Sequence, residues 1–96
     1  MTIFIKKFGM VLTSRQSGKE ALLAFFPTLN GMDTQEKICV DFEGVSAFSP
    51  AWGDEFMTPL QKQFGNRLFL YHSQNPSVEL TIKTLETANG FSFARG

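Results

Sequence analysis

The chain has 96 residues, with nine basic and nine acidic side chains. Its length fits one domain, because domains run from about 50 to 250 residues, and its 43% hydrophobic and 19% charged composition is typical of a folded globular protein. The formal net charge is zero and the bases are dispersed among the acids, which argues against nucleic acid as a partner, because phosphate binding needs a basic surplus or stripe.

The counts of cysteine and histidine and the length of the apolar runs argue against further classes of protein. One cysteine cannot form an internal disulfide, which fits a reducing compartment, and one cysteine with one histidine is too little for a zinc site. No apolar run reaches the roughly 18 residues that a membrane span needs. We therefore expect a cytoplasmic protein with no metal, no cofactor and no membrane partner.

The first third of the chain predicts a strand and a helix. Residues 2–8 mix β-branched and aromatic side chains, as strands do. Two serines suited to cap a helix follow, at 14 and 17, and apolar residues then recur at helical spacing from Leu22 to Leu29. Because proline inside a helix removes a hydrogen bond, Pro27 predicts that the helix stops near Phe26.

The middle of the chain repeats this order. Residues 38–42 form an apolar, β-branched run interrupted only by its aspartate, which indicates an interior strand. Ser49 followed by Pro50 is a strong helix start. Pro59 predicts a kink or an early end of this helix. The apolar stripe of the helix repeats every four residues: Trp52, Phe56, Leu60 and Phe64.

The last third predicts a third strand and a third helix. Residues 67–71 read as a strand, and Asn75 with Pro76 begins a helix that runs to the Asn89-Gly90 turn. The six residues from Phe91 either add an edge strand, dock on the core or form a sticky tail. The order βαβαβα predicts an α/β fold, with a small, mostly parallel or mixed sheet connected by crossover helices.

Three motifs carry a resemblance to a known family. They are LTSR at 12–15, DFEGV at 41–45 and WGDEF at 52–56. Together they resemble the STAS-like domain family of unknown function, which is similar in fold to the STAS domains of anti-sigma factor antagonists. The resemblance covers about residues 9–86 of a single domain spanning 1–96.

The resemblance implies a regulatory, protein-interaction module of bacterial type rather than an enzyme. It implies contact with a partner through residues 44–56, the partner being a histidine-kinase-type ATPase or another switch protein, and it allows a homodimer. In STAS antagonists, phosphorylation of a serine at the start of the following helix controls partner binding. This chain departs from that pattern, since Pro50 stands at the phosphoacceptor position and Ser49 at the position of the preceding aspartate.

Several polar residues are candidates for the partner contact or for a switch. A phosphate on Ser49, or less directly on Ser46, would meet unpaired amides at a helix N-terminus, although an N-cap is the simpler role for Ser49. Asp54 and Glu55 either form an acidic recognition pair or join Arg15 in an ion pair between two helices. Arg15 could instead receive a phosphate or a partner carboxylate.

Two aromatic residues near the loop extend this hypothesis. Phe48 and Trp52 could contribute to an exposed contact patch, since aromatic side chains are enriched in binding hot spots, although helical spacing favours a core role. If they do, Trp52→Ala should impair partner binding and leave the fold largely intact.

A second class of function uses the ends of two predicted strands. Asp41 and His72 should lie near the carboxyl edge of the sheet, with Ser73 beside them, where α/β proteins usually bind ligands. This arrangement would suit a small-molecule or nucleotide binder, or a weak enzyme. No nucleophile elbow, phosphate-binding glycine loop or metal-binding motif supports catalysis, so we expect no catalytic residues. A simpler role for Asp41 is to accept hydrogen bonds from the amides of the following loop.

Overall fold

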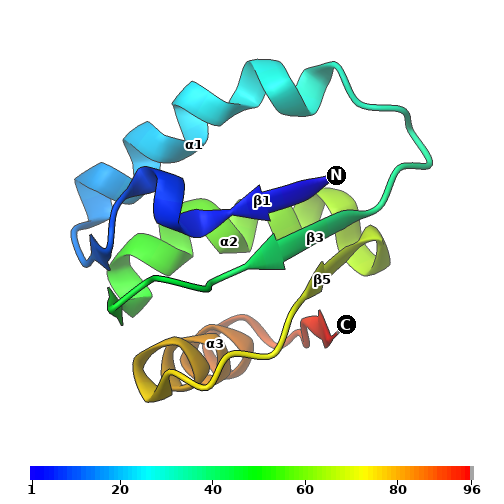
Figure 1. The fold of residues 1–96 in the computed structure, drawn as a ribbon. Helices are drawn as coiled ribbons and strands as arrows, with labels where there is room; N and C mark the ends of the chain where they lie inside the picture. The colour runs from blue at the N-terminus through cyan, green and yellow to red at the C-terminus, as the bar shows by residue number, and fades with distance from the viewer. Residues whose placement is uncertain (96) are drawn as a thin grey trace.

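The computed structural model describes residues 1–95, which form three α-helices, two 3-10 helices and two sheets of parallel strands (Figure 1). In chain order the elements are β1 (Thr2–Phe4), the 3-10 helix η1 (Ile5–Phe8), β2 (Val11–Leu12), α1 (Arg15–Asn30), β3 (Ile38–Asp41), β4 (Ala47–Phe48), α2 (Pro50–Phe64), the 3-10 helix η2 (Gly65–Arg67), β5 (Leu68–Leu70), α3 (Pro76–Asn89) and β6 (Ala94–Arg95).

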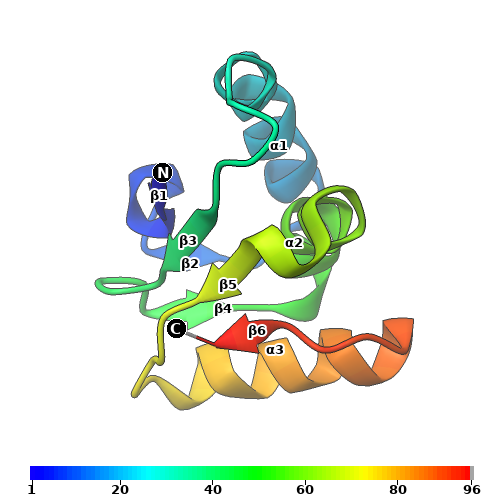
Figure 2. The ribbon, with the colours of Figure 1, turned by 90° about the vertical axis from the view of Figure 1, so that its right-hand side faces the viewer.

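The main sheet adds its strands in the order of the chain. Its order is β1-β3-β5-β6, every neighbouring pair is parallel, and each step from one strand to the next passes through one helix. Since such crossovers are right-handed and all run in one direction, they put α1, α2 and α3 on the same face of the sheet. Figure 2 shows the helices following one another along that side. The fold is therefore α/β with a mostly parallel sheet, as predicted; β2 and β4 form a small second sheet.

The core lies between the sheet and the helices. Alternate strand residues such as Ile3, Val40 and Leu70 point inward and are fully buried. Trp52 and Phe56 of α2 stack against each other with ring centroids 4.9 Å apart. α1 packs on α2 and α2 packs on α3, so α2 is the central helix.

The first strand is shorter than the sequence indicated. The chain leaves the sheet after Phe4 and turns through η1, which the amide of Gly9 closes by donating to the carbonyl of Lys6 at 3.0 Å. Strict alternation through residue 8 would have turned Lys7 into the core and Phe8 out of it. The turn instead brings Phe8 to Phe56, with ring centroids 5.1 Å apart.

The two helical prolines do not end their helices. The end expected near Phe26 was wrong, and so was the early end that was one of the two alternatives at Pro59. α1 continues past Pro27 to Asn30, and α2 continues past Pro59 to Phe64. Pro27 is exposed, so water can reach the carbonyl that lost its partner. Burial of Phe64 anchors the last turn of α2 and helps to offset the cost of Pro59, about 3 kcal/mol.

The C-terminal segment both packs on the core and adds a strand to the sheet. Phe93 is buried in the core, and β6 continues the sheet beside β5. The amide of Phe93 donates to the carboxylate of Glu86 at 2.7 Å, and Arg95 pairs with Glu79 at 3.0 Å. Gly96, the last residue of the expected tail, lies outside the described residues. Within residues 1–95, no helix has the length and hydropathy to cross a membrane.

Candidate functional site

The candidate site is the edge of the molecule at which the strands end and the three helices begin. In a parallel sheet with helical crossovers, these ends fall on one side. The segment between β3 and α2 and the segment between β5 and α3 meet there. Every candidate residue predicted from the sequence lies at or near this edge, which we call the carboxyl edge.

The loop of residues 42–49 is fixed by side chains from the start of α3. The amide nitrogen Nδ2 of Asn75 donates to the carbonyls of Val45 and Ser46, at 2.9 and 3.0 Å. The hydroxyl of Ser77 accepts from the amide of Phe48 and donates to its carbonyl, both at 3.1 Å. These four hydrogen bonds tie the loop to the start of α3.

The two candidate serines have different environments. Ser49 is the N-cap of α2: its hydroxyl oxygen accepts from the amide of Trp52 at 3.4 Å and its hydroxyl donates to the carbonyl of Thr13 at 2.8 Å. Ser49 is half-buried, whereas Ser46 is exposed. Ser46 therefore offers the more accessible hydroxyl of the pair.

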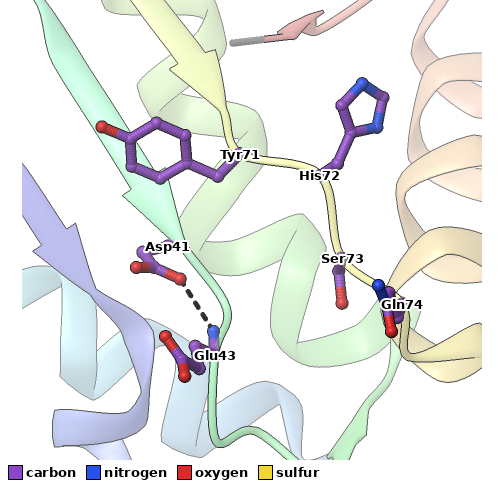
Figure 3. A pocket seen from close by; sticks show the side chains of 6 residues that line it. All are labelled: Asp41, Glu43, Tyr71, His72, Ser73 and Gln74. Atoms are coloured by element: carbon purple, nitrogen blue, oxygen red, sulfur yellow. Dashed lines mark hydrogen bonds between the residues drawn. The ribbon is translucent and has the colours of Figure 1, made fainter.

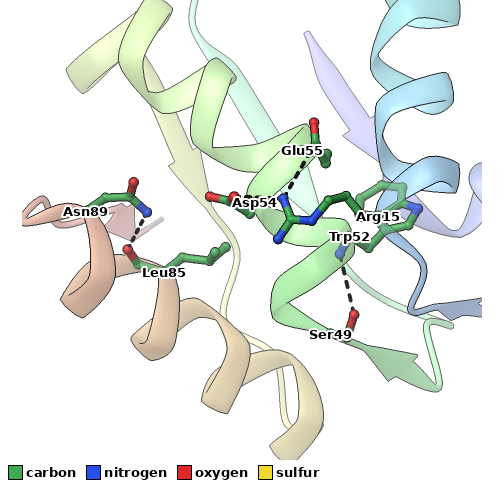
Figure 4. A network of polar contacts seen from close by, with 7 residues as sticks. All are labelled: Arg15, Ser49, Trp52, Asp54, Glu55, Leu85 and Asn89. Atoms are coloured by element: carbon green, nitrogen blue, oxygen red, sulfur yellow. Dashed lines mark hydrogen bonds and ion pairs between the residues drawn. The ribbon is translucent and has the colours of Figure 1, made fainter.

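Arg15 joins the acidic pair of α2 in an ion pair (Figure 4). Its Nη1 lies 3.0 Å from Oδ2 of Asp54 and 3.0 Å from Oε1 of Glu55. These contacts, first the one with Glu55 and then the one with Asp54, raise the pKa of the Arg15 guanidinium above its usual value. Of the alternatives for these residues, the structure shows the ion pair between helices.

The aromatic part of the predicted contact surface is wrong. Phe48 is 2% exposed and Trp52 is 0% exposed, so neither side chain reaches the surface. β4 turns Phe48 inward against Phe42, with ring centroids 4.9 Å apart, while the Trp52 ring lies against those of Phe8, Phe48 and Phe56. Trp52→Ala should consequently destabilise the fold rather than test a binding surface.

Two other apolar residues occupy the surface beside the loop, and the sequence analysis missed them. Met10 is 61% exposed and Val11 is 65% exposed. Val11 pairs with Ala47 in the small sheet, and the carbonyl of Met10 accepts from the amides of Ser46 and Ala47, at 2.8 and 3.1 Å. The sequence signal was the apolar run at 10–12. The two-residue strand β2 buries Leu12 and turns Val11 to the opposite face, and Met10 precedes the strand.

The alternative candidates come together around a cavity at the other end of the same edge (Figure 3). It measures about 490 Å³ and is open to solvent, since most of its lining residues are exposed. The lining residues are Asp41, Glu43, Tyr71, His72, Ser73 and Gln74. Asp41, His72 and Ser73 thus share one cavity, as the strand-end hypothesis predicted.

Two of the lining side chains also hold the backbone. Oδ1 of Asp41 accepts from the amide of Glu43 at 2.9 Å, which confirms the loop-holding role predicted for Asp41. The hydroxyl oxygen of Ser73 accepts from the amide of Asn75 at 3.1 Å. Among residues 1–95, no hydrogen bond joins Ser73 to His72, and no three metal-ligating side chains gather in one place.

Tyr71 links the cavity to the outer face of the sheet. Its phenol has a raised pKa, chiefly through hydrogen bonding and charge interaction with the Cys39 side chain, then through desolvation and the charge of Asp41. The protonated phenol is therefore the form that this environment favours.

Comparison with known proteins adds no relative. No family model matches the chain, no curated protein matches it, and no solved structure matches it. The resemblance to STAS-like domains stays a prediction that the three sequence motifs carry.

Proposed function

We propose that this protein is a non-catalytic regulatory module that binds a partner protein through the carboxyl edge. The observation that carries the proposal is the exposed pair Met10 and Val11, held in register against the braced loop of residues 42–49. The contact surface proposed from the sequence, 44–56, is thereby revised: Met10, Val11 and Ser46 replace Phe48 and Trp52.

Exposed apolar residues are ordinary when they are isolated, so their setting decides their meaning. Here two of them are adjacent, belong to a segment that is hydrogen-bonded to the loop of residues 42–49, and are bordered by polar groups such as Ser46. That is the anatomy of a binding site, with an apolar centre and a polar rim. A surface already fixed loses little conformational entropy on binding, and a methionine adapts its shape to a partner.

The polar groups at this edge favour binding over catalysis. The hydroxyls of Ser49 and Ser73 both hold backbone groups rather than a base. By the resemblance, the partner would be a histidine-kinase-type ATPase or another switch protein, with Ser46 as the accessible position for a modification that controls binding.

The proposal is tested by capture from the native host with matched variants. The test variant is Met10→Ser combined with Val11→Ser. The control is Leu80→Ser on α3, which removes a side chain that is 68% exposed on another surface. We expect mass spectrometry to identify a protein captured by the wild type and the control but not by the test variant, and calorimetry with that purified protein to show at least a tenfold loss of affinity. Equal binding by all three proteins would contradict the proposal.

A second candidate function is favoured by the cavity at Asp41, His72 and Ser73. Its volume of about 490 Å³ is in the range of small-molecule sites. Asp41 and Glu43 would repel the phosphates of a nucleotide, which favours an uncharged or cationic ligand. Titration of the labelled protein with ATP tests the nucleotide version: NMR shifts at residues 71–74 without shifts elsewhere would support it.

A further inference from the structure

We propose that the cavity of residues 41, 43 and 71–74 receives an arginine side chain of the partner protein. This inference rests on the proposed function and specifies the chemistry of the partner. It follows from the charge of the cavity, the kinds of groups that line it, and its position beside the apolar pair.

The two carboxylates that line the cavity form no ion pair within residues 1–95. Among residues 1–95, four other carboxylates have a cationic group within 4 Å, but neither Asp41 nor Glu43 does. Lys6 runs alongside Gly44, yet it forms no ion pair with either carboxylate. Of the basic residue types, the lining includes His72 but no lysine or arginine. The four paired carboxylates are those of Glu36, Asp54, Glu55 and Glu79.

The lining groups fit a planar cation. Asp41 is held in place by the amide of Glu43 and retains a second carboxylate oxygen for a ligand. In Figure 3 the ring of Tyr71 lies on the same side of the cavity as both carboxylates, with Ser73 and Gln74 opposite. Asp41 and Tyr71 both line the cavity, and the charge of Asp41 contributes to the raised pKa of the Tyr71 phenol.

These groups favour an arginine side chain over a lysine side chain. A guanidinium presents several donors in one plane, so it can bond two carboxylates, and its face stacks on an aromatic ring. A lysine ammonium is a compact, strongly hydrated charge that gains less from the planar arrangement. A cavity of about 490 Å³ has room for the whole side-chain head.

The position of the cavity allows one partner to use both features. Glu43 and Ser46 belong to the same loop, so the cavity and the Met10–Val11 pair lie at its two ends. Arginine is among the residue types that are enriched in interface hot spots.

The first experiment needs no partner. The ¹⁵N-labelled protein is titrated with N-acetyl-arginine amide, with the neutral isostere N-acetyl-citrulline amide, and with N-acetyl-lysine amide. We expect NMR shifts at residues 41–44 and 71–74 with the arginine probe, at least fivefold weaker binding of the lysine probe, and none of the citrulline probe. Equal responses to arginine and citrulline, or none to arginine, would overturn the inference.

Matched variants locate the binding. Asp41→Asn keeps the oxygen that accepts from the Glu43 amide and removes only the charge. Glu43→Gln removes the charge of an exposed side chain. Each substitution should lower the affinity for the arginine probe by about fivefold to tenfold. The control Glu20→Gln removes a carboxylate of α1 that bonds Gln16, away from the cavity, and should change nothing. An unchanged affinity in Asp41→Asn and Glu43→Gln would refute the assignment.

The final experiment separates this inference from the proposed function. Asp41→Asn combined with Glu43→Gln should reduce affinity for the captured partner at least tenfold. If that variant binds the partner normally while Met10→Ser with Val11→Ser does not, the interaction surface stands and the arginine site is overturned. If the probe binds but the Met10 and Val11 substitutions leave capture unchanged, the proposed function fails instead.

Discussion

The closest approach of two helices in this fold makes a prediction that opposes helix propensity. Gly18 is buried on α1, where α1 crosses α2. A Cβ atom at this position would lie 2.6 Å from the carbonyl oxygen of Trp52 and 3.0 Å from its Cα. Both atoms are backbone, so no side-chain rotation relieves the contact, and Gly18→Ala forces the helices apart.

Two opposing effects set the size of the change. Replacing an interior helical glycine with alanine stabilises a helix by about 0.5–1 kcal/mol through propensity alone. Overpacking a rigid interior costs about 1–3 kcal/mol and can cost more. Since the clash is with the backbone of the central helix, we expect the cost to prevail, with a net loss of about 1–2 kcal/mol. For a domain of this size that lowers Tm by about 5 to 15 °C.

Urea unfolding followed by the fluorescence of the single tryptophan measures this change. The matched control is Ser17→Ala, one residue earlier on an exposed face of α1, which should change the free energy of unfolding by no more than about 0.5 kcal/mol. If Gly18→Ala is as stable as the control or more stable, the close packing of α1 on α2 is refuted.

Three further predictions test the core, the cap and the sheet face. Trp52→Ala should lower the free energy of unfolding by about 3–5 kcal/mol by circular dichroism, and a loss below about 1 kcal/mol would contradict its burial. Ser49→Ala should cost about 1 kcal/mol by urea unfolding, against almost nothing for Ser46→Ala; equal losses would argue against the cap. Absorbance titration of Tyr71 should give a midpoint above the ordinary value of about 10, and Cys39→Ser should lower it. Because the pKa of Tyr71 is raised in the folded state, its contribution to stability is present below the unfolded pKa and is lost as pH rises through the folded one.

The predicted order of strands and helices was right because it depends on local patterns. The caps Ser49 and Asn75 begin α2 and α3 where the sequence placed them, since a cap needs only its own turn. The errors arose where packing outweighs local preference. Pro27 and Pro59 are tolerated because buried neighbours hold the turns that follow them, and that burial is a property of the assembled core.

The candidate site was predicted in part. Asp41 and His72 share a cavity because parallel strands end at one edge, a consequence of the βα order itself. Phe48 and Trp52 were assigned to the surface incorrectly, and Met10 and Val11 were missed. Exposure of an apolar residue depends on which neighbours cover it, and those neighbours are distant in the chain.

The alternating apolar patterns and the helix caps by themselves determined an α/β domain with a mostly parallel sheet. These properties follow from residue types and short-range spacing. Only the tertiary structure decided which charges are compensated: it paired Arg15 with Asp54 and Glu55 across two helices and left Asp41 and Glu43 without a cation within ion-pair distance among residues 1–95. An ion pair requires a distance of a few ångströms, and for residues 39 positions apart in the chain that distance is set by the packing of the helices.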